Sequence, residues 1–182
     1  MRLLPALALC VVVLASSTLT AAPKSEARLR PQDTRLTNLL RQGSERSTTF
    51  KALVDRIESS NVIVYVALNP LMKKSLSGML TWMTRTGDYR YLRASISTDL
   101  TADQMIATLA HELQHAVEVI EDETVIDEAS LVSLYRRIGR QSGNAAPMRW
   151  ETVAAQETGF KVRRELGSAP TTIVARSGDT RS

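Results

Sequence analysis

Apolar residues recur every three or four positions in five stretches of the chain, and this is the spacing that places them on one face of a helix. The sequence therefore predicts helices in these stretches. They are expected over 36–43, 47–59, 101–120 and 128–139, and from Pro147 or Met148 to Leu166.

A different pattern lies between the second and third of these helices. Val62–Leu68 is a continuous run rich in β-branched residues, which is typical of a buried strand. Two further strands are expected over Leu76–Thr84 and Tyr89–Ser97, with Arg85–Asp88 as a hairpin connection between them. The prediction is an α+β domain with N-terminal helices, a three-stranded, partly antiparallel sheet, a central helix and two C-terminal helices.

The N-terminus has the pattern of a targeting signal. Met1-Arg2 gives a positive start, Leu3–Leu14 is apolar, and Thr20-Ala21-Ala22 offers small residues for cleavage. The apolar run is too short for a comfortable membrane span, so the mature chain is expected to have none and to be secreted or periplasmic. We expect a signal peptide over 1–22, an N-terminal arm and short helix over 23–46, the folded domain over 47–167 and a disordered tail over 168–182.

The composition argues against cysteine chemistry and against a nucleic-acid surface. The one cysteine, Cys10, lies inside the expected signal peptide, so the mature protein has neither disulfides nor cysteine ligands. The net charge of +4 comes from lysines and arginines that are spread along the chain without interleaved aromatic residues. This pattern favours solvated helix faces over a nucleic-acid surface.

The central helix contains the sequence His111-Glu112-Leu113-Gln114-His115, and these are the two histidines of the chain. Residues four apart lie one above the other on a helix, so both imidazoles can share one metal ion. Glu112 is rotated by about 100° from His111, beside the metal position, where it can take a proton from a water molecule. The alternative interpretation is an ordinary structural helix in which the motif is a coincidence.

Two histidines do not complete a zinc site, so the third ligand must be a carboxylate. Glu151 is favoured because the small residues Ala154 and Ala155 beside it let two helices approach closely, while Glu157 is the rival and Glu128 a third candidate. The other acidic residues that follow the motif, from Glu118 onward, are interpreted as a solvated helix end and turn.

The motif resembles that of the zincin metallopeptidases, in particular the gluzincins, in which a Glu from a later helix joins H-E-x-x-H. The architecture over about 47–166 also resembles small secreted bacterial proteins of this type. The resemblance implies one Zn²⁺ per chain, with His111, His115 and Glu151 as ligands and Glu112 as general base. Glu121 stands where a metzincin has its last ligand, but Glu118 replaces the glycine that the metzincin turn requires.

The chain also departs from the gluzincin pattern. Ala155 stands where enzymes of the thermolysin kind carry an Asp that orients a histidine. The oxyanion-stabilising residue is unassigned, because no further histidine exists; Tyr89, Tyr91, Tyr135 or an arginine are candidates.

The resulting hypothesis is a secreted zinc metallopeptidase that acts on a peptide or protein substrate, with the strand over Tyr89–Ser97 pairing with that substrate. Two alternatives stay open. One is a zinc-stabilised, non-catalytic binding module of the cell envelope, and the other is a helical interaction protein without metal.

Overall fold

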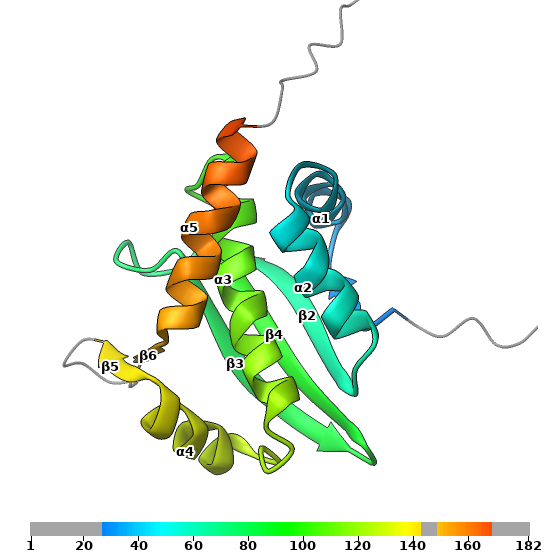
Figure 1. Cartoon of the computed structure of the whole chain (residues 1–182), viewed down its shortest axis with the longest axis vertical. Coiled ribbons are helices and arrows are strands. Elements are labelled where there is room, and N and C mark those ends of the chain that lie inside the picture. Colours follow the sequence, from blue (N-terminus) through cyan, green and yellow to red (C-terminus); the bar gives the residue numbers. More distant parts are fainter. Residues whose placement is uncertain (1–26, 143–148, 169–182) are drawn as a thin grey trace, which may run out of the picture.

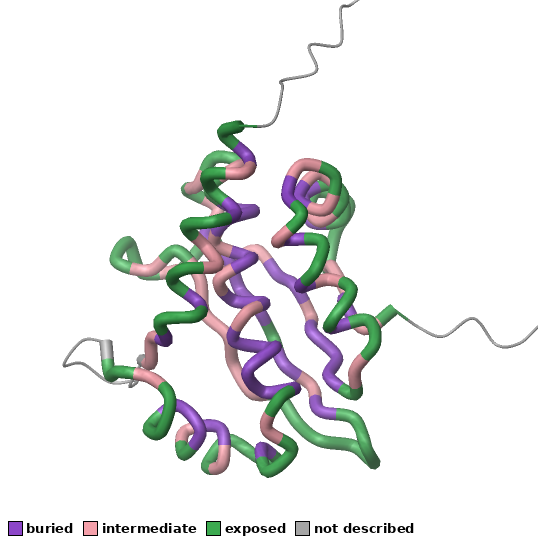
Figure 2. Tube along the Cα trace, in the orientation of Figure 1, coloured by how far each residue is buried: buried purple, intermediate pink, exposed green. Residues whose placement is uncertain are grey.

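The computed structural model describes residues 27–142 and 149–168, and in them helices pack on one face of a mixed sheet (Figure 1). This arrangement confirms the α+β class. In Figure 1, α3 (Ala102–Glu121) crosses the sheet, with α1 and α2 on one side of it and α5 on the other. Figure 2 shows buried positions concentrated on α3 and on the strands beneath it. The expected signal peptide and all but the first residue of the expected tail lie outside the described residues.

The sheet has four strands in the order β1-β2-β4-β3. They are β1 (Leu29–Pro31), β2 (Val62–Asn69), β3 (Gly78–Thr86) and β4 (Tyr89–Ser97). Strand β2 lies parallel to both β1 and β4, whereas β3 and β4 are antiparallel. The expected three strands are confirmed, but the count was one short, because the three residues of β1 are too few to show a periodic pattern.

Strand β4 lies between β2 and β3, so its backbone is paired on both sides. The expectation that the strand over Tyr89–Ser97 pairs with a substrate is therefore wrong. The edge strands are β1 and β3, and β3, which lies beside Glu112 of the motif on α3, is the one that an extended peptide could join. Hydrophobic periodicity predicts that a strand exists but carries no information about its place in the sheet.

Two N-terminal helices pack beside α3, namely α1 (Thr34–Arg46) and α2 (Thr48–Glu58). Helix α1 was predicted to end at Gly43 but continues through it to Arg46. The glycine allows the helix to pack closely against its neighbour and does not end it. A β-carbon there would lie 2.8 Å from the ring of Phe50. Leu29, Leu36 and Leu39 belong to the same core as α3, so the N-terminal arm from Leu29 onward is part of the domain.

Helix α3 is the predicted central helix. Thr101 and Gln104 form the expected capping box at its start. Its apolar face is buried completely at Met105, Ile106, Leu109, Leu113 and Ala116. This burial fixes the position of the motif that the helix carries.

The C-terminal part departs most from prediction. Helix α4 (Glu128–Ile138) is as expected, but a two-stranded sheet of β5 (Arg140–Ser142) and β6 (Arg149–Glu151) follows it. Helix α5 (Val153–Ser168) therefore begins at Val153, after Pro147 and Met148, which lie outside the described residues. Thr152 caps it, since its Oγ1 accepts a hydrogen bond of 3.1 Å from the Ala155 N–H. Within the described ranges, no helix has the length and apolar character needed to cross a membrane.

Candidate metal centre

The two histidines lie one turn apart on α3, with ring centroids 4.9 Å apart in an edge-to-face arrangement. His115 is buried and His111 is partly buried. Both side chains project toward the space between β3, β6 and α5, because the opposite face of α3 is fixed against the core.

Glu151 completes a cluster with them. Its Oε2 lies 3.3 Å from His111 Nε2, and one donor atom from each of His111, His115 and Glu151 lies within 4.8 Å of the others. The predicted residues are therefore brought together, but Glu151 comes from the end of β6 and not from the first turn of a helix. Pairing of Arg140 with Glu151 across the two-stranded sheet holds it there.

The other candidate carboxylates are not part of this cluster. Glu157 and Glu121 are exposed. Glu128 is exposed at the start of α4 and lines the cavity next to the cluster without contributing a donor atom to it. Of the two small residues that motivated Glu151, Ala155 is fully buried but Ala154 is exposed. The close approach of α5 to α3 also involves Gly159, where a β-carbon would lie 3.4 Å from the Ala107 carbonyl oxygen.

The donor set fits zinc. Two imidazoles and one carboxylate form the three-ligand set of catalytic zinc sites, which keep a further position open. With ligands about 2.0–2.1 Å from a tetrahedral zinc ion, neighbouring donor atoms are roughly 3.4 Å apart. The separation of 3.3 Å between His111 and Glu151 matches this spacing, and the wider limit of 4.8 Å requires a contraction of the cluster around the ion.

Electrostatics within the cluster are dominated by burial and by the contact between His111 and Glu151. Burial lowers the pKa of His111, but the hydrogen bond to Glu151 and the charges of Glu112 and Glu151 outweigh it, so the net shift is upward. The same contact lowers the pKa of Glu151. The carboxylate is thus held in its charged form, the form in which a carboxylate can bind a metal ion.

Glu112 follows His111 on α3 and is 5% exposed. Burial raises its pKa, while the charges of His115 and His111 and a hydrogen bond from the Leu80 backbone act in the opposite direction. Gly78 of β3 makes room for it, because a β-carbon at that position would lie 2.5 Å from Glu112 Oε1. Glu112 is therefore fixed between the cluster and β3, and it is not one of the three residues that supply donor atoms.

The sequence did not predict the role of Glu118. It was assigned to a solvated helix end, but it is only 7% exposed. Its Oε2 lies 2.8 Å from His115 Nδ1, and its Oε1 accepts a hydrogen bond of 2.5 Å from Thr152 Oγ1. A carboxylate at Nδ1 makes this the protonated nitrogen and leaves Nε2 free to bind a metal. The only sequence signal for this role was the spacing of three residues from His115, on the same helix face.

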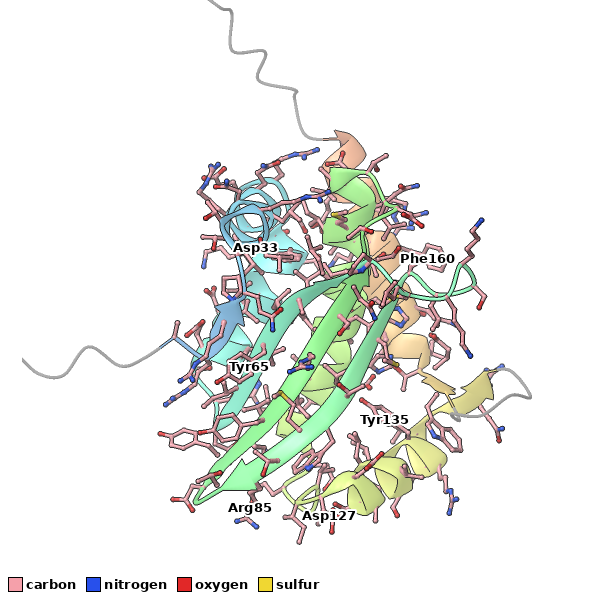
Figure 3. All side chains as sticks on the ribbon, turned by 180° about the vertical axis from the view of Figure 1, so that it is seen from behind. Asp33, Tyr65, Arg85, Asp127, Tyr135 and Phe160 are labelled. Atoms are coloured by element: carbon pink, nitrogen blue, oxygen red, sulfur yellow. The ribbon has the colours of Figure 1, made fainter. Side chains whose placement is uncertain are left out.

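The candidate tyrosines are separated by the fold. Tyr89 is exposed and accepts a hydrogen bond from Arg28, and Tyr91 lies on β4. Tyr135 is buried with its ring 5.3 Å from that of His115, between the sheet and α4 (Figure 3). Its hydroxyl donates to the His115 carbonyl oxygen at 3.3 Å. Tyr135 thus borders the centre, but its hydroxyl is engaged with the backbone of α3.

The cluster lies in a cleft with two hollows that share His111, Glu112 and Glu151. One, of about 500 Å³, is bounded by residues 75–78, α3 and α5 and includes Arg163. The other, of about 300 Å³, is bounded by β3, α4 and β6. In Figure 3, Phe160 marks the α5 side of the centre and Tyr135 the α4 side.

Comparisons of the chain with protein-family models, with curated proteins and with solved structures found no match.

Proposed function

We propose that the protein is a zinc-dependent hydrolase, a metallopeptidase of the zincin kind, with His111, His115 and Glu151 as ligands and Glu112 as general base. The observation that carries the proposal is the convergence of these four side chains beside the free edge of a strand. The N-terminal apolar segment supports a further part of the proposal, namely a secreted or periplasmic location.

A zinc ion held by these three residues would supply a Lewis acid that polarises the scissile carbonyl and lowers the pKa of water to about 7. Glu112 takes a proton from the attacking water at a carboxylate oxygen and passes it to the leaving amine. Burial raises the pKa of Glu112, so the protonated carboxyl that this transfer requires costs less than it would in water.

Strand β3 gives the substrate a place to bind. The Ser97 N–H donates to the Ser77 carbonyl at 2.8 Å, so the backbone groups of Ser77 face β4. Because the backbone N–H and C=O groups of successive residues in a strand point to opposite sides, the backbone groups of Gly78, Leu80 and Trp82 point away from β4, toward the cleft. The Leu80 backbone already bonds to Glu112 in this direction. An extended peptide paired with this edge would pass directly over the general base.

The rival interpretation is a zinc-stabilised binding module. A structural zinc site has four protein ligands. The cluster found in the described residues has three members, which favours a catalytic site.

The test combines metal analysis with turnover of a quenched-fluorescent peptide library. We expect about one zinc per chain, lost in His115→Ala. Glu112→Gln should keep the zinc and lose turnover, because the amide cannot accept the proton. Full activity in Glu112→Gln, or no zinc in the wild type after reconstitution, would overturn the proposal.

A further inference from the structure

Two large apolar side chains stand out in water on neighbouring segments. Leu71, in the loop over 70–77, is 90% exposed, and Phe160, on α5, is 61% exposed; they are the most exposed large apolar side chains among the described residues. Residues 75–77 of the loop line the larger hollow together with Phe160. Figure 1 shows the loop projecting on the side of α5. The two apolar side chains therefore belong to one side of the molecule.

A defined turn holds Leu71 in this position. Its N–H donates to Asn69 Oδ1 at 3.0 Å, which is the bond of an Asx-turn. The Met72 N–H donates to the Asn69 carbonyl oxygen at 3.3 Å, and the Leu76 N–H donates to the Lys73 carbonyl oxygen at 2.8 Å. The exposure of Leu71 thus follows from the hydrogen bonding of its own loop.

Cationic side chains accompany both apolar ones. Five of them are exposed on the two segments: Lys73, Lys74, Lys161, Arg163 and Arg164. In the described part of the chain, no salt bridge engages either lysine of the loop or either arginine of α5.

Acidic side chains do little to offset this charge. Glu157 is the one carboxylate within 70–77 and 157–164, so these two segments carry five positive charges and one negative charge. Glu165, the next acidic residue on α5, is turned toward α2, where it accepts hydrogen bonds from Ser47 and Thr49. We call Leu71, Phe160 and the five cations the basic rim.

The composition of the basic rim favours a lipid surface over other partners. Apolar side chains can enter the boundary between headgroups and acyl chains while lysine and arginine remain at the anionic headgroups. Interfaces with proteins are depleted in lysine, and three of the rim residues are lysines. Phe160 is the one aromatic side chain of the rim, which is too few for a stacking surface for nucleic acid. A second copy of the chain would bring the same positive charge.

We propose that the basic rim attaches the protein to an anionic lipid surface, with Leu71 and Phe160 inserted among the headgroups. This attachment goes beyond the proposed hydrolase and requires neither zinc nor turnover. The secreted or periplasmic location proposed above would bring the chain to such a surface.

The experiment measures sedimentation of the protein with large vesicles. It uses residues 23–182, because the apolar segment of the expected signal peptide would itself bind lipid, and this part contains the whole described core. One set of vesicles is phosphatidylcholine alone, and the other contains phosphatidylcholine and phosphatidylglycerol in equal parts. The protein should bind the anionic vesicles about 10-fold or more tightly than the neutral ones.

Replacement of the apolar side chains tests the insertion. Leu71→Gln and Phe160→Gln should each weaken binding to the anionic vesicles by about 5–10-fold. Ile126→Gln is the matched control, because Ile126 is 48% exposed and lies near Arg85 at the opposite end of β3, but beside Asp88 and Glu123. It should bind like the wild type.

Replacement of charges tests the headgroup contacts. The double variant Lys73→Gln with Lys74→Gln should bind about 20–30-fold more weakly, since each cation at an anionic surface contributes about fivefold. The control is Lys51→Gln with Arg56→Gln, two exposed positions on α2, which gives the same net charge. It should stay within about twofold of the wild type. All these positions are exposed, so circular dichroism should be unchanged.

Several results would overturn the attachment: no binding to either kind of vesicle, equal binding to both, wild-type binding by the rim variants, or an equal loss in the two double variants. Wild-type protein that ignores the vesicles but binds polyglutamate, and loses this binding in the Lys73 and Lys74 double variant, would assign the rim to an acidic protein instead. None of these results bears on zinc content or peptide turnover, so the hydrolase and the attachment can fail separately.

Discussion

His115 Nδ1 lies 2.8 Å from Glu118 Oε2, and both side chains are buried. The other oxygen of this carboxylate accepts from Thr152, which follows Glu151 and caps α5. Glu118 therefore connects His115, a candidate ligand on α3, to Thr152, which follows the candidate ligand Glu151 on β6. Ala155 has no polar side chain with which to orient a histidine, and the carboxylate beside His115 comes from Glu118 on the same helix.

Replacement of Glu118 should weaken zinc binding without removing a ligand. Outer carboxylates of this kind affect metal affinity by about 10–100-fold, and we expect a loss in this range for Glu118→Ala and a smaller loss for Glu118→Gln. Competition against a chromophoric chelator measures it. Glu121→Gln, at an exposed position three residues further on, is the control and should bind zinc like the wild type. Equal affinities in all the variants would show that Glu118 does not orient His115.

The motif helix could be predicted from the sequence because its signals are local. The capping box of Thr101 and Gln104, the apolar face and the spacing of His111 and His115 all lie within one helix. Glu151, the predicted third ligand, does lie in the cluster with the two histidines, but on β6 and not on the helix where it was expected. The pairing that makes β6 a strand involves three residues on each side, which is too short to leave a periodic pattern.

The role of Glu118 could not be predicted for a related reason. An acidic run at a helix end is usually solvated, and the partner that buries this one, Thr152, lies 34 positions away. The same limit applies to β3, because strand order depends on long-range pairing that local patterns do not encode.

Gly78→Ala should impair catalysis and spare metal binding. The new β-carbon would lie 2.5 Å from Glu112 Oε1 and 2.7 Å from Thr108 Cγ2, so the carboxylate must move. A displacement of about 1 Å at a reacting group can cost about 100-fold in rate, so kcat should fall by roughly 10–100-fold. Zinc content should stay at the wild-type level. Gly167→Ala is the control, because no atom lies within 4 Å of its added carbon. An unchanged kcat in Gly78→Ala would show that Glu112 need not occupy the observed position.

Glu165 should make the stability of the domain depend on pH. Its carboxylate accepts hydrogen bonds from Ser47 Oγ at 2.5 Å, from the Thr49 N–H at 3.1 Å and from Thr49 Oγ1 at 2.6 Å, and so joins α5 to the start of α2. Burial raises the pKa of Glu165, but these hydrogen bonds outweigh it and the net shift is downward. The stabilisation is therefore present above the unfolded pKa of about 4.3 and is lost as the pH falls through the lower folded value.

Glu165→Gln should lower the free energy of unfolding by about 1 kcal/mol at pH 7, after allowance for the partial exposure of the site. The difference from wild type should shrink as the pH falls below about 4. Urea titrations at pH 7 and pH 3 measure both values. Glu157→Gln, at an exposed position on the same helix, should change neither. A difference that stays constant with pH would mean that the charge of Glu165 plays no part.

Removal of zinc should lower the melting temperature without unfolding the domain. The core residues of α3, including Leu109, Leu113 and Ala116, belong to an apolar core shared with α1, α2 and the sheet, so the fold does not depend on the metal alone. Zinc at 100 times its Kd stabilises the folded state by about 2.7 kcal/mol, which for a domain of this size corresponds to about 5–10 °C. Thermal melts followed by circular dichroism, with and without a chelator, measure this shift in melting temperature. Glu151→Gln, which lacks one candidate ligand, should show only a small shift when the chelator is added. Complete loss of the folded signal in the chelator at 25 °C would instead identify the zinc as structural and favour the binding-module alternative.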